Sequence, residues 1–307
     1  MGRYIIRRLL QMIPVFIGTT FIIFYMVYAL PGDPIRALSG DRTLSPAFYN
    51  ELRERYNLND PLIIQYVKYM LNIVQGDFGQ TFRGREVSEI IAERWPVTIK
   101  LAFIAFVFEI IIGLLAGILA GLRKGSFIDN LVLISTTLVV SIPIFVLGFT
   151  AQLILGVKLS IFPVAGLGEG LMSYLLPGLI LAAIQLAYLA RLTRTSLVEN
   201  MRADYVRTAV AKGLSRSRVV GRHAFRNSLI PVVTLLGLDI GFLMGGAIVT
   251  EGIFNIPGIG QQVFQSIRLQ EGTVVVGITT MLVVVFLAAN LFVDVLYGLL
   301  DPRIRYE

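Results

Sequence analysis

Six long apolar segments restrict this chain to folds that cross a membrane. At a rise of about 1.5 Å per residue, roughly 20 apolar residues cross a hydrocarbon core of about 30 Å. The segments run near Leu9–Leu30, Leu101–Leu122, Leu131–Val157, Leu171–Leu192, Leu229–Ile253 and Val274–Leu300. Charged residues make up only 15% of the chain, whereas a soluble domain holds about a quarter. The sequence therefore predicts an all-α membrane protein with six transmembrane helices in the cell membrane.

The distribution of Lys and Arg predicts which side of the membrane each loop faces. With a cytoplasmic N-terminus, 16 of the 27 basic residues fall in cytoplasmic loops and tails. The short outer connections then hold only Lys158 and Arg268, with Lys100 at the outer end of the second span. The other eight lie in residues 31–97, a segment too long to follow the positive-inside rule. Both termini are therefore expected in the cytoplasm, and the net charge of +7 gives no reason to expect nucleic-acid binding.

The first apolar segment has one alternative interpretation. Arg7 and Arg8 precede an apolar run that ends in Val27-Tyr28-Ala29, a pattern that also occurs in cleaved signal peptides. The apolar run is longer than the usual signal-peptide core of about 7–15 residues. Its removal would also leave five spans and break the charge pattern. We therefore expect the segment to be retained as a transmembrane helix.

The expected organisation has four parts. They are residues 1–30 (first transmembrane helix with a basic N-terminus), 31–97 (an extracytoplasmic segment), 98–302 (a core of five transmembrane helices that includes a cytoplasmic loop, 193–228) and 303–307 (a cytoplasmic tail). Short helices are predicted near Pro46–Tyr56 and Pro61–Gln75. A segment of about 65 residues is marginal as an independent fold. We therefore expect it to lean on the membrane part.

The loop between the fourth and fifth spans is ordered and basic. Gly213 follows Lys212 and is a good helix stop, since glycine readily takes the left-handed conformation that closes a helix. Ser215 is suited to cap a new helix with its hydroxyl group. Two short helices joined at Gly213 are therefore predicted. Arginines on the second helix are spaced to form a basic stripe, with Val220 and Ala224 roughly opposite. These arginines are Arg218, Arg222 and Arg226.

Motifs in this loop and elsewhere carry a family resemblance. Tyr205–Gly213 reads Tyr-Val-Arg-Thr-Ala-x-Ala-Lys-Gly, and His223–Pro231 reads His-x-x-Arg-Asn-x-Leu-Ile-Pro. Further motifs are Arg7–Leu10, Leu30–Pro34, Gly76–Gly79 and Leu300–Arg305. Together they resemble the permeases of ABC importers, in the dipeptide, oligopeptide and nickel group, and most closely the first of the two permease subunits of a dipeptide system. Arg207 and Phe225-Arg226 depart from the general loop consensus of such permeases, but both departures are usual in the peptide group.

The resemblance implies both an architecture and a function. It implies the fold of a type I ABC-importer permease, and the role of a transmembrane permease subunit in an ATP-driven importer for di- or oligopeptides. The implied partners are a second homologous permease, two P-loop ATPase subunits and an extracytoplasmic peptide-binding protein. The residues implied to couple to the ATPase are Arg207, Ala209, Gly213, Ser215, Arg218, Arg222 and Arg226. Nickel-chelate and glutathione systems share these motifs, so both stay open as alternative substrates.

No cofactor is expected in this chain. Residues 117–126 are glycine-rich but lack the Gly-Lys-[Ser/Thr] pattern of a phosphate loop, so ATP and Mg would be bound by partner subunits. The chain has no cysteine, and His223 is its only histidine, which disfavours a metal site. Neither observation supports a catalytic centre, and we expect a transport subunit rather than an enzyme.

Three acidic residues fall within the predicted spans. A carboxylate inside the membrane is costly and usually faces a cavity or a partner. Asp239 lies centrally in the fifth span, and we assign it to the translocation pathway from its position alone, where a carboxylate would meet the amino group of a peptide. Glu109 is expected to bond to a neighbouring helix. Asp294 is expected to pair with a loop arginine or to extend to the membrane surface.

These acids also suit a different class of protein. A proton-coupled secondary transporter carries protons on such groups, but this interpretation leaves the loop around Gly213 unexplained. No inverted internal repeat is evident in the sequence either. The ABC permease is therefore the favoured hypothesis.

Small residues at spacings of four predict close helix contacts within the spans. Small side chains let two membrane helices approach closely. One set lies in the second span and comprises Gly113, Gly117 and Gly121, and the other lies in the fifth span and comprises Gly241 and Gly245.

Overall fold

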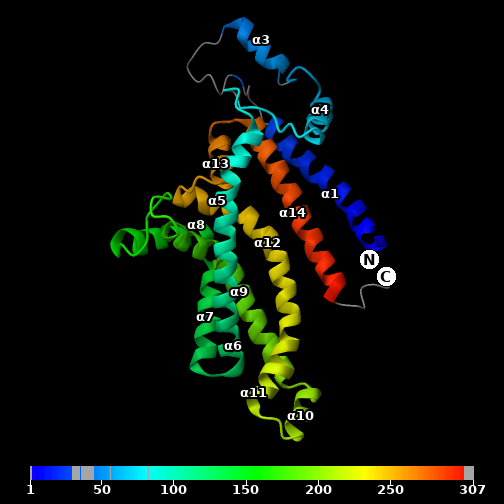
Figure 1. The fold of residues 1–307 in the computed structure, drawn as a ribbon. Helices are drawn as coiled ribbons and strands as arrows, with labels where there is room; N and C mark the ends of the chain where they lie inside the picture. Colours follow the sequence, from blue (N-terminus) through cyan, green and yellow to red (C-terminus); the bar gives the residue numbers. More distant parts are fainter. Residues whose placement is uncertain (1, 30–34, 36–44, 56, 82, 301–307) are drawn as a thin grey trace. The chain divides into compact units, whose positions relative to one another are not determined.

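The computed structural model describes residues 2–29, 35, 45–55, 57–81 and 83–300 (Figure 1). The Leu30–Pro34 motif, most of the Leu300–Arg305 motif and the expected tail at 303–307 lie outside these residues. Within the described ranges the regular elements are helices. Gln80 and Glu86 also form an isolated antiparallel bridge in the loop before α5. In chain order the helices, with π-helical stretches marked η, are α1 (Gly2–Tyr28), α3 (Pro46–Arg55), α4 (Leu62–Val74), α5 (Val87–Phe108), η1 (Glu109–Gly113), α6 (Leu114–Leu122), α7 (Phe127–Ser141), α8 (Ile144–Ala151), η2 (Gln152–Lys158), α9 (Met172–Met201), α10 (Asp204–Ala211), α11 (Arg216–Arg218), η3 (Val219–Phe225), α12 (Arg226–Phe254), α13 (Ile259–Arg268) and α14 (Gly272–Leu300).

Most of the predicted spans form continuous helices. Five helices in the described residues are long and apolar enough to cross a membrane. They are Ile5–Tyr28, Val87–Leu122, Met172–Met201, Arg216–Gly245 and Gly272–Val295. The second of them joins α5, η1 and α6 without a break and begins well before the predicted span at Leu101.

The third predicted span is not a straight helix. Residues 127–141 and 144–158 are bent by 106° relative to each other, so Leu131–Val157 counts as a sixth span only if both halves are taken together. The break lies at Ile142, which is extended with φ −99° and ψ 127°, and at Pro143. Proline lacks an amide hydrogen and disfavours helical backbone at the preceding residue.

The chain forms two compact units, residues 1–98 with 257–307 and residues 99–256, whose boundary falls inside α5. In the first unit, α1 lies along α14 and contacts α4. The Tyr66 hydroxyl of α4 lies 2.9 Å from Thr20 Oγ1 of α1, and the Tyr69 hydroxyl donates to Thr280 Oγ1 of α14 at 2.8 Å. The segment between the first two spans therefore leans on membrane helices, as expected for a segment too small to fold alone.

In the second unit, α9 is the central helix, against which α6, α7 and α12 lie. The glycines of the second span sit directly on α9. A Cβ at Gly117 would lie 2.6 Å from the carbonyl oxygen of Ala190, and one at Gly113 would lie 2.9 Å from the Leu189 side chain. Gly121 faces Leu197 in the same way. Three successive turns therefore allow a close approach of two helix backbones.

The glycines of the fifth span are placed differently. Gly241 is buried in α12, but Gly245 is exposed, and nothing in the described residues lies within 4 Å of the Cβ that it would carry. The spacing of four residues therefore does not make a second ladder on α9.

A charged contact attaches α7 to α9. The Arg194 guanidinium of α9 donates to both carboxylate oxygens of Asp129 in α7, at 2.9 and 2.8 Å. Asp129 also accepts from the backbone amide of Gly125 at 2.8 Å, and Ser126 caps the start of α7. A two-bond arginine–carboxylate pair fixes orientation as well as distance. The turn between α6 and α7 is thus attached to α9.

The contact at Gly117 generates a stability prediction. Gly117→Ala places a methyl group against backbone on α9, and overfilling of this kind typically costs about 1–3 kcal/mol. We expect a lower thermal unfolding temperature for the purified protein in detergent. The matched control is Gly18→Ala in α1, where nothing lies within 4 Å. Equal unfolding temperatures for the two variants would contradict the assigned α6–α9 contact.

Candidate functional site

The end of α10 has the geometry that the sequence predicted for Gly213. Gly213 has a φ of +77°. Its amide donates to the Val210 carbonyl at 2.9 Å, and the Leu214 amide donates to the Ala209 carbonyl at 3.3 Å. These two bonds form a Schellman motif, which satisfies the last carbonyls of a helix and turns the chain sharply. The direction in which the chain leaves α10 is therefore set by local backbone geometry.

The helix after Gly213 differs from the prediction in its length. α11, η3 and α12 follow one another with helical backbone at each junction, so the expected short second helix is the beginning of the fifth span (Figure 1). Ser215 takes the cap position with extended backbone, but its hydroxyl accepts no bond from the first turn and instead lies 3.4 Å from Ser217 Oγ. The predicted cap bond at Ser215 is therefore wrong. The first turn of α11 is stabilised instead by its continuation into η3 and α12.

The π-helical stretch η3 changes which residues are buried. Val219 and Ala224, five residues apart, are buried, whereas Val220 is only half-buried. The predicted opposing pair of Val220 and Ala224 is therefore corrected to Val219 and Ala224, because a π-helix adds a residue to the turn. The three stripe arginines keep their exposure through this turn. They are Arg218, Arg222 and Arg226.

A small apolar core holds this loop to the rest of its unit. It joins Leu197 of α9, Val206 and Ala209 of α10, and Val219 and Ala224 of η3. Ala209 therefore lies on the buried face of α10 and helps to position that helix, while the opposite face of α10 is exposed. A hydrogen bond also joins α9 to α12, in which the Ser196 hydroxyl donates to the Ser228 carbonyl at 3.2 Å.

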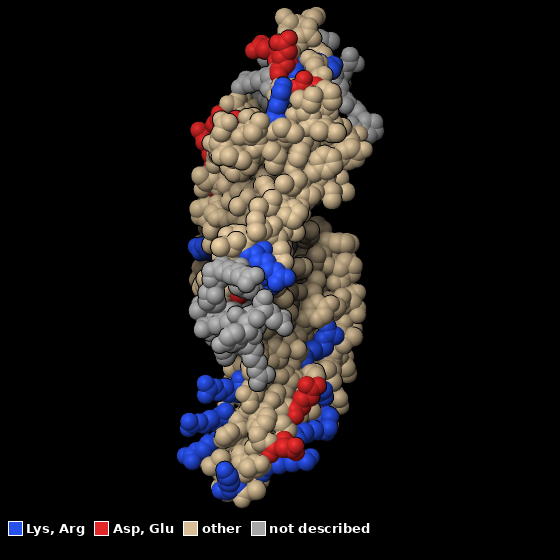
Figure 2. All heavy atoms as spheres, turned by 90° about the vertical axis from the view of Figure 1, so that its right-hand side faces the viewer, with Lys and Arg blue, Asp and Glu red and all other residues tan. Residues whose placement is uncertain are grey.

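The exposed surface above this core is basic with two apolar side chains. Basic side chains gather over α10, α11 and the beginning of α12 (Figure 2). Arg207 is exposed and pairs only loosely with Asp204 at 3.5 Å. Tyr205 and Val210 are exposed apolar residues beside it. Neither residue was predicted from the sequence, although the spacing of three between Val206 and Ala209, which are buried, indicates that the residues between and beside them face outward. We call the exposed residues of 204–226 the basic surface.

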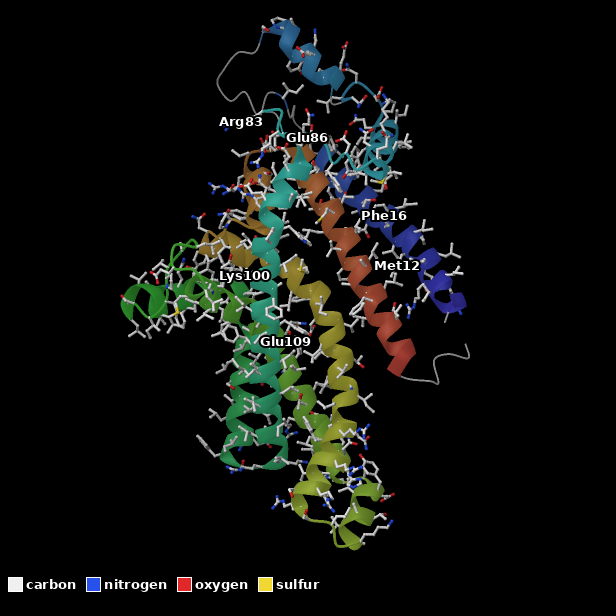
Figure 3. All side chains as sticks on the ribbon, viewed as in Figure 1. Met12, Phe16, Arg83, Glu86, Lys100 and Glu109 are labelled. Carbon is white, nitrogen blue, oxygen red and sulfur yellow. The ribbon has the colours of Figure 1, made fainter. Side chains whose placement is uncertain are left out.

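The acid assigned to the translocation pathway lies in the interior of the second unit. Asp239 is only 2% exposed, and its Oδ1 accepts from the Gln185 amide of α9. Glu109, at the start of η1 (Figure 3), is fully buried, and its carboxyl group interacts with that of Asp239. Neither Glu109 oxygen nor Asp239 Oδ2 has a hydrogen-bond partner in the described part of the chain. These residues form a buried acid cluster.

The third intramembrane acid has a simple role. Asp294 of α14 pairs with Arg8 at 3.3 Å. The expectation of an arginine partner is met by a residue of α1 rather than of a loop. The pair joins the first and last spans within one unit.

Comparison with known proteins identifies the family. The family described as "Binding-protein-dependent transport system inner membrane component" matches residues 113–306, and its N-terminal counterpart matches residues 1–102. The chain belongs to this family. The protein is therefore a multi-pass inner-membrane component of a transport system.

Relatives of this permease match over nearly their whole length. It is 37% identical to the dipeptide transport system permease protein DppB of Alkalihalophilus pseudofirmus, over 99% of both chains. It is 36% identical to the oligopeptide transport system permease protein AppB of Bacillus subtilis, and 38% identical to the glutathione transport system permease protein GsiC of Escherichia coli, over 100% of the chains in each case.

A solved structure supports the fold. A chain of the MetNI methionine ABC transporter matches with a TM-score of 0.57 at 17% identity, covering 69% of this permease and 96% of that chain. The fold is that of a type I ABC-importer permease.

Proposed function

We propose that this permease is the transmembrane subunit of an ATP-driven importer for di- or oligopeptides, and that it forms the translocation pathway with a second, homologous permease subunit. The observation that carries the proposal is the basic surface, held on a buried core and aimed by the turn at Gly213. Relatives named as dipeptide and oligopeptide permeases, similar over their full length, support the peptide substrate. A glutathione permease of similar identity makes glutathione the second candidate, with nickel chelate as the third.

The proposed orientation places the N-terminus, the C-terminus and the basic surface in the cytoplasm. The excess of Lys and Arg in the corresponding loops supports this placement. Residues 31–97 then lie on the opposite side, where a peptide-binding protein would deliver its ligand.

The basic surface is proposed to contact one of two ATPase subunits. This chain has no phosphate-loop pattern, so ATP and Mg would be bound by those subunits. Tyr205 and Val210 offer apolar anchors for such a contact, and the surrounding arginines offer charge. Aromatic and arginine side chains commonly dominate the binding energy of interfaces.

The continuity of α11, η3 and α12 supplies a mechanical path. A force on Arg218 acts on the same helix that carries Asp239, because no flexible break separates the two residues. Closure of the ATPase subunits would therefore move α12 as part of a rigid-body change between outward- and inward-facing states. The alternating access of the importer is proposed to follow from this coupling.

The requirement for ATP tests the function. The complex is reconstituted in liposomes with its binding protein, and radiolabelled dipeptide uptake is measured with ATP or with a proton gradient. We expect uptake to need ATP and the ATPase subunits. Uptake by this chain alone, driven by a proton gradient, would instead establish the proton-coupled secondary transporter.

The turn at Gly213 tests the coupling. Valine is strongly disfavoured at positive φ, at a cost of about 1–2 kcal/mol or more, whereas asparagine tolerates this conformation. No atom lies within 4 Å of the added Cβ, so the effect is one of backbone geometry. We expect Gly213→Val to lose most peptide uptake and the stimulation of ATPase activity by loaded binding protein, and Gly213→Asn to retain both. Normal values for the valine variant would show that this turn does not transmit the coupling.

The pathway assignment of Asp239 stays a prediction with its own test. Asp239→Asn keeps an oxygen that accepts from Gln185 but removes the charge. We expect lower peptide uptake with unchanged complex assembly and ATPase docking. The control Asp294→Asn changes an acid of the other unit, which already pairs with Arg8, and we expect it to change uptake less. Unaltered uptake in the Asp239 variant would remove this residue from the pathway.

A further inference from the structure

Helix α4 belongs to the segment between the first two spans, which the sequence assigns to the aqueous side. One of its faces packs on the spanning helices. Tyr66 is buried there, with its hydroxyl donating to the Ile17 carbonyl of α1 at 3.0 Å and its ring edge-on to Phe21 and Phe24. Tyr69 reaches α14 through Thr280. This face fixes α4 directly against α1 and α14.

The remaining surface of α4 divides into a polar and an apolar stripe. Ile63, Val67, Leu71 and Val74 follow one another at spacings of four, four and three, and are 69%, 50%, 58% and 86% exposed. This is one continuous helix face without a charged or polar residue. Lys68 lies on the neighbouring polar stripe and bonds to Asp60 at 2.6 Å. Such a division is typical of a helix that lies at a membrane surface.

The apolar stripe continues onto α1. A cavity of about 600 Å³ lies between the two helices. Nearly all of its lining is apolar, and Met12 and Phe16 contribute from α1 (Figure 3). Ile13 and Ile17 of α1, also in the lining, are themselves exposed and belong to a span. The stripe of α4 is therefore continuous with a surface that already faces lipid.

We infer that α4 is embedded in the extracytoplasmic leaflet of the bilayer, with its apolar stripe against lipid acyl chains. With 13 residues, α4 is about 20 Å long and too short to cross a hydrocarbon core of about 30 Å. The backbone N–H and C=O groups within a helix bond to one another, so a helix can enter the hydrocarbon without hydrogen bonds to other segments. The groove between α4 and α1 accommodates acyl chains.

This inference rests on the membrane placement of α1 and not on the transported substrate. It fails or holds independently of peptide import, so its test and the uptake experiments give distinguishable outcomes. A protein partner on the same stripe is the competing occupant, and the test separates it from lipid.

The chain has no cysteine, which permits single spin labels without removing native thiols. Val67→Cys on the apolar stripe and Lys68→Cys beside it are labelled in the full complex, assembled in lipid nanodiscs from partner subunits that carry no cysteine. Accessibility to oxygen, which partitions into lipid, is compared with accessibility to a water-soluble nickel chelate. Ile22→Cys on α1, an exposed position outside the lining of this cavity, is the lipid reference, and Glu54→Cys on α3 is the water reference.

We expect the label at residue 67 to match the lipid reference, with high oxygen and low nickel accessibility, and the label at residue 68 to shift toward the water reference. Leu71→Cys repeats the measurement on the same stripe should the first variant assemble poorly. A stripe label open to nickel would overturn the inference, because the helix would then lie in water. A stripe label shielded from both reagents would overturn it in favour of a protein partner.

Discussion

The close approach of α6 to α9 is the contact on which the second unit depends. In a bilayer the hydrophobic effect does not drive helices together, since lipid is as apolar as their side chains. Association then relies on van der Waals contact over a long, close interface. Gly113, Gly117 and Gly121 provide that interface on three successive turns. The Asp129–Arg194 pair attaches α7, the helix that follows α6, to the same α9, and loss of either partner would leave the other poorly satisfied. The helices α7, α8 and α12 also contact α9.

Much of this arrangement could be predicted from the sequence because it is encoded locally. Apolar length predicted the spans, and the Lys-Gly sequence predicted the left-handed residue at Gly213. Whether a proline interrupts a helix, in contrast, could not be predicted from the neighbouring residues. Pro177 is buried inside continuous α9, where neighbouring helices can satisfy the freed carbonyl, whereas Pro143 is exposed and ends α7. The same residue type therefore gives a helix in one place and a bend of 106° in another.

The π-helical stretches were also beyond a sequence pattern. A period of 3.6 residues predicts Val220 opposite the arginines, but packing on Leu197 of α9 selects Val219 and Ala224, five residues apart. The cap at Ser215 failed for a related reason, because α11 is stabilised by its continuation into α12 and not by a side-chain bond. The first difference arises from a tertiary contact with α9, and the second from the continuation of the helix beyond its first turn.

The second unit buries two carboxyl groups close together. Glu109 and Asp239 are buried carboxyl groups, and Gln185 is the residue that bonds to this cluster in the described structure. A buried polar group without a full set of partners costs free energy, and a charged one costs more. The α6–α9 interface also bears a buried polar group, the Thr193 hydroxyl beside Gly117, which has no hydrogen-bond partner in the described residues. The carboxyl groups, in contrast, are carried by η1 and α12. The desolvation cost is therefore shared by the second span, which carries Glu109, and by α12, which carries Asp239 and extends directly from the basic surface. The helix on which a partner at the basic surface would act is thus also the helix that buries Asp239 against Gln185 of α9.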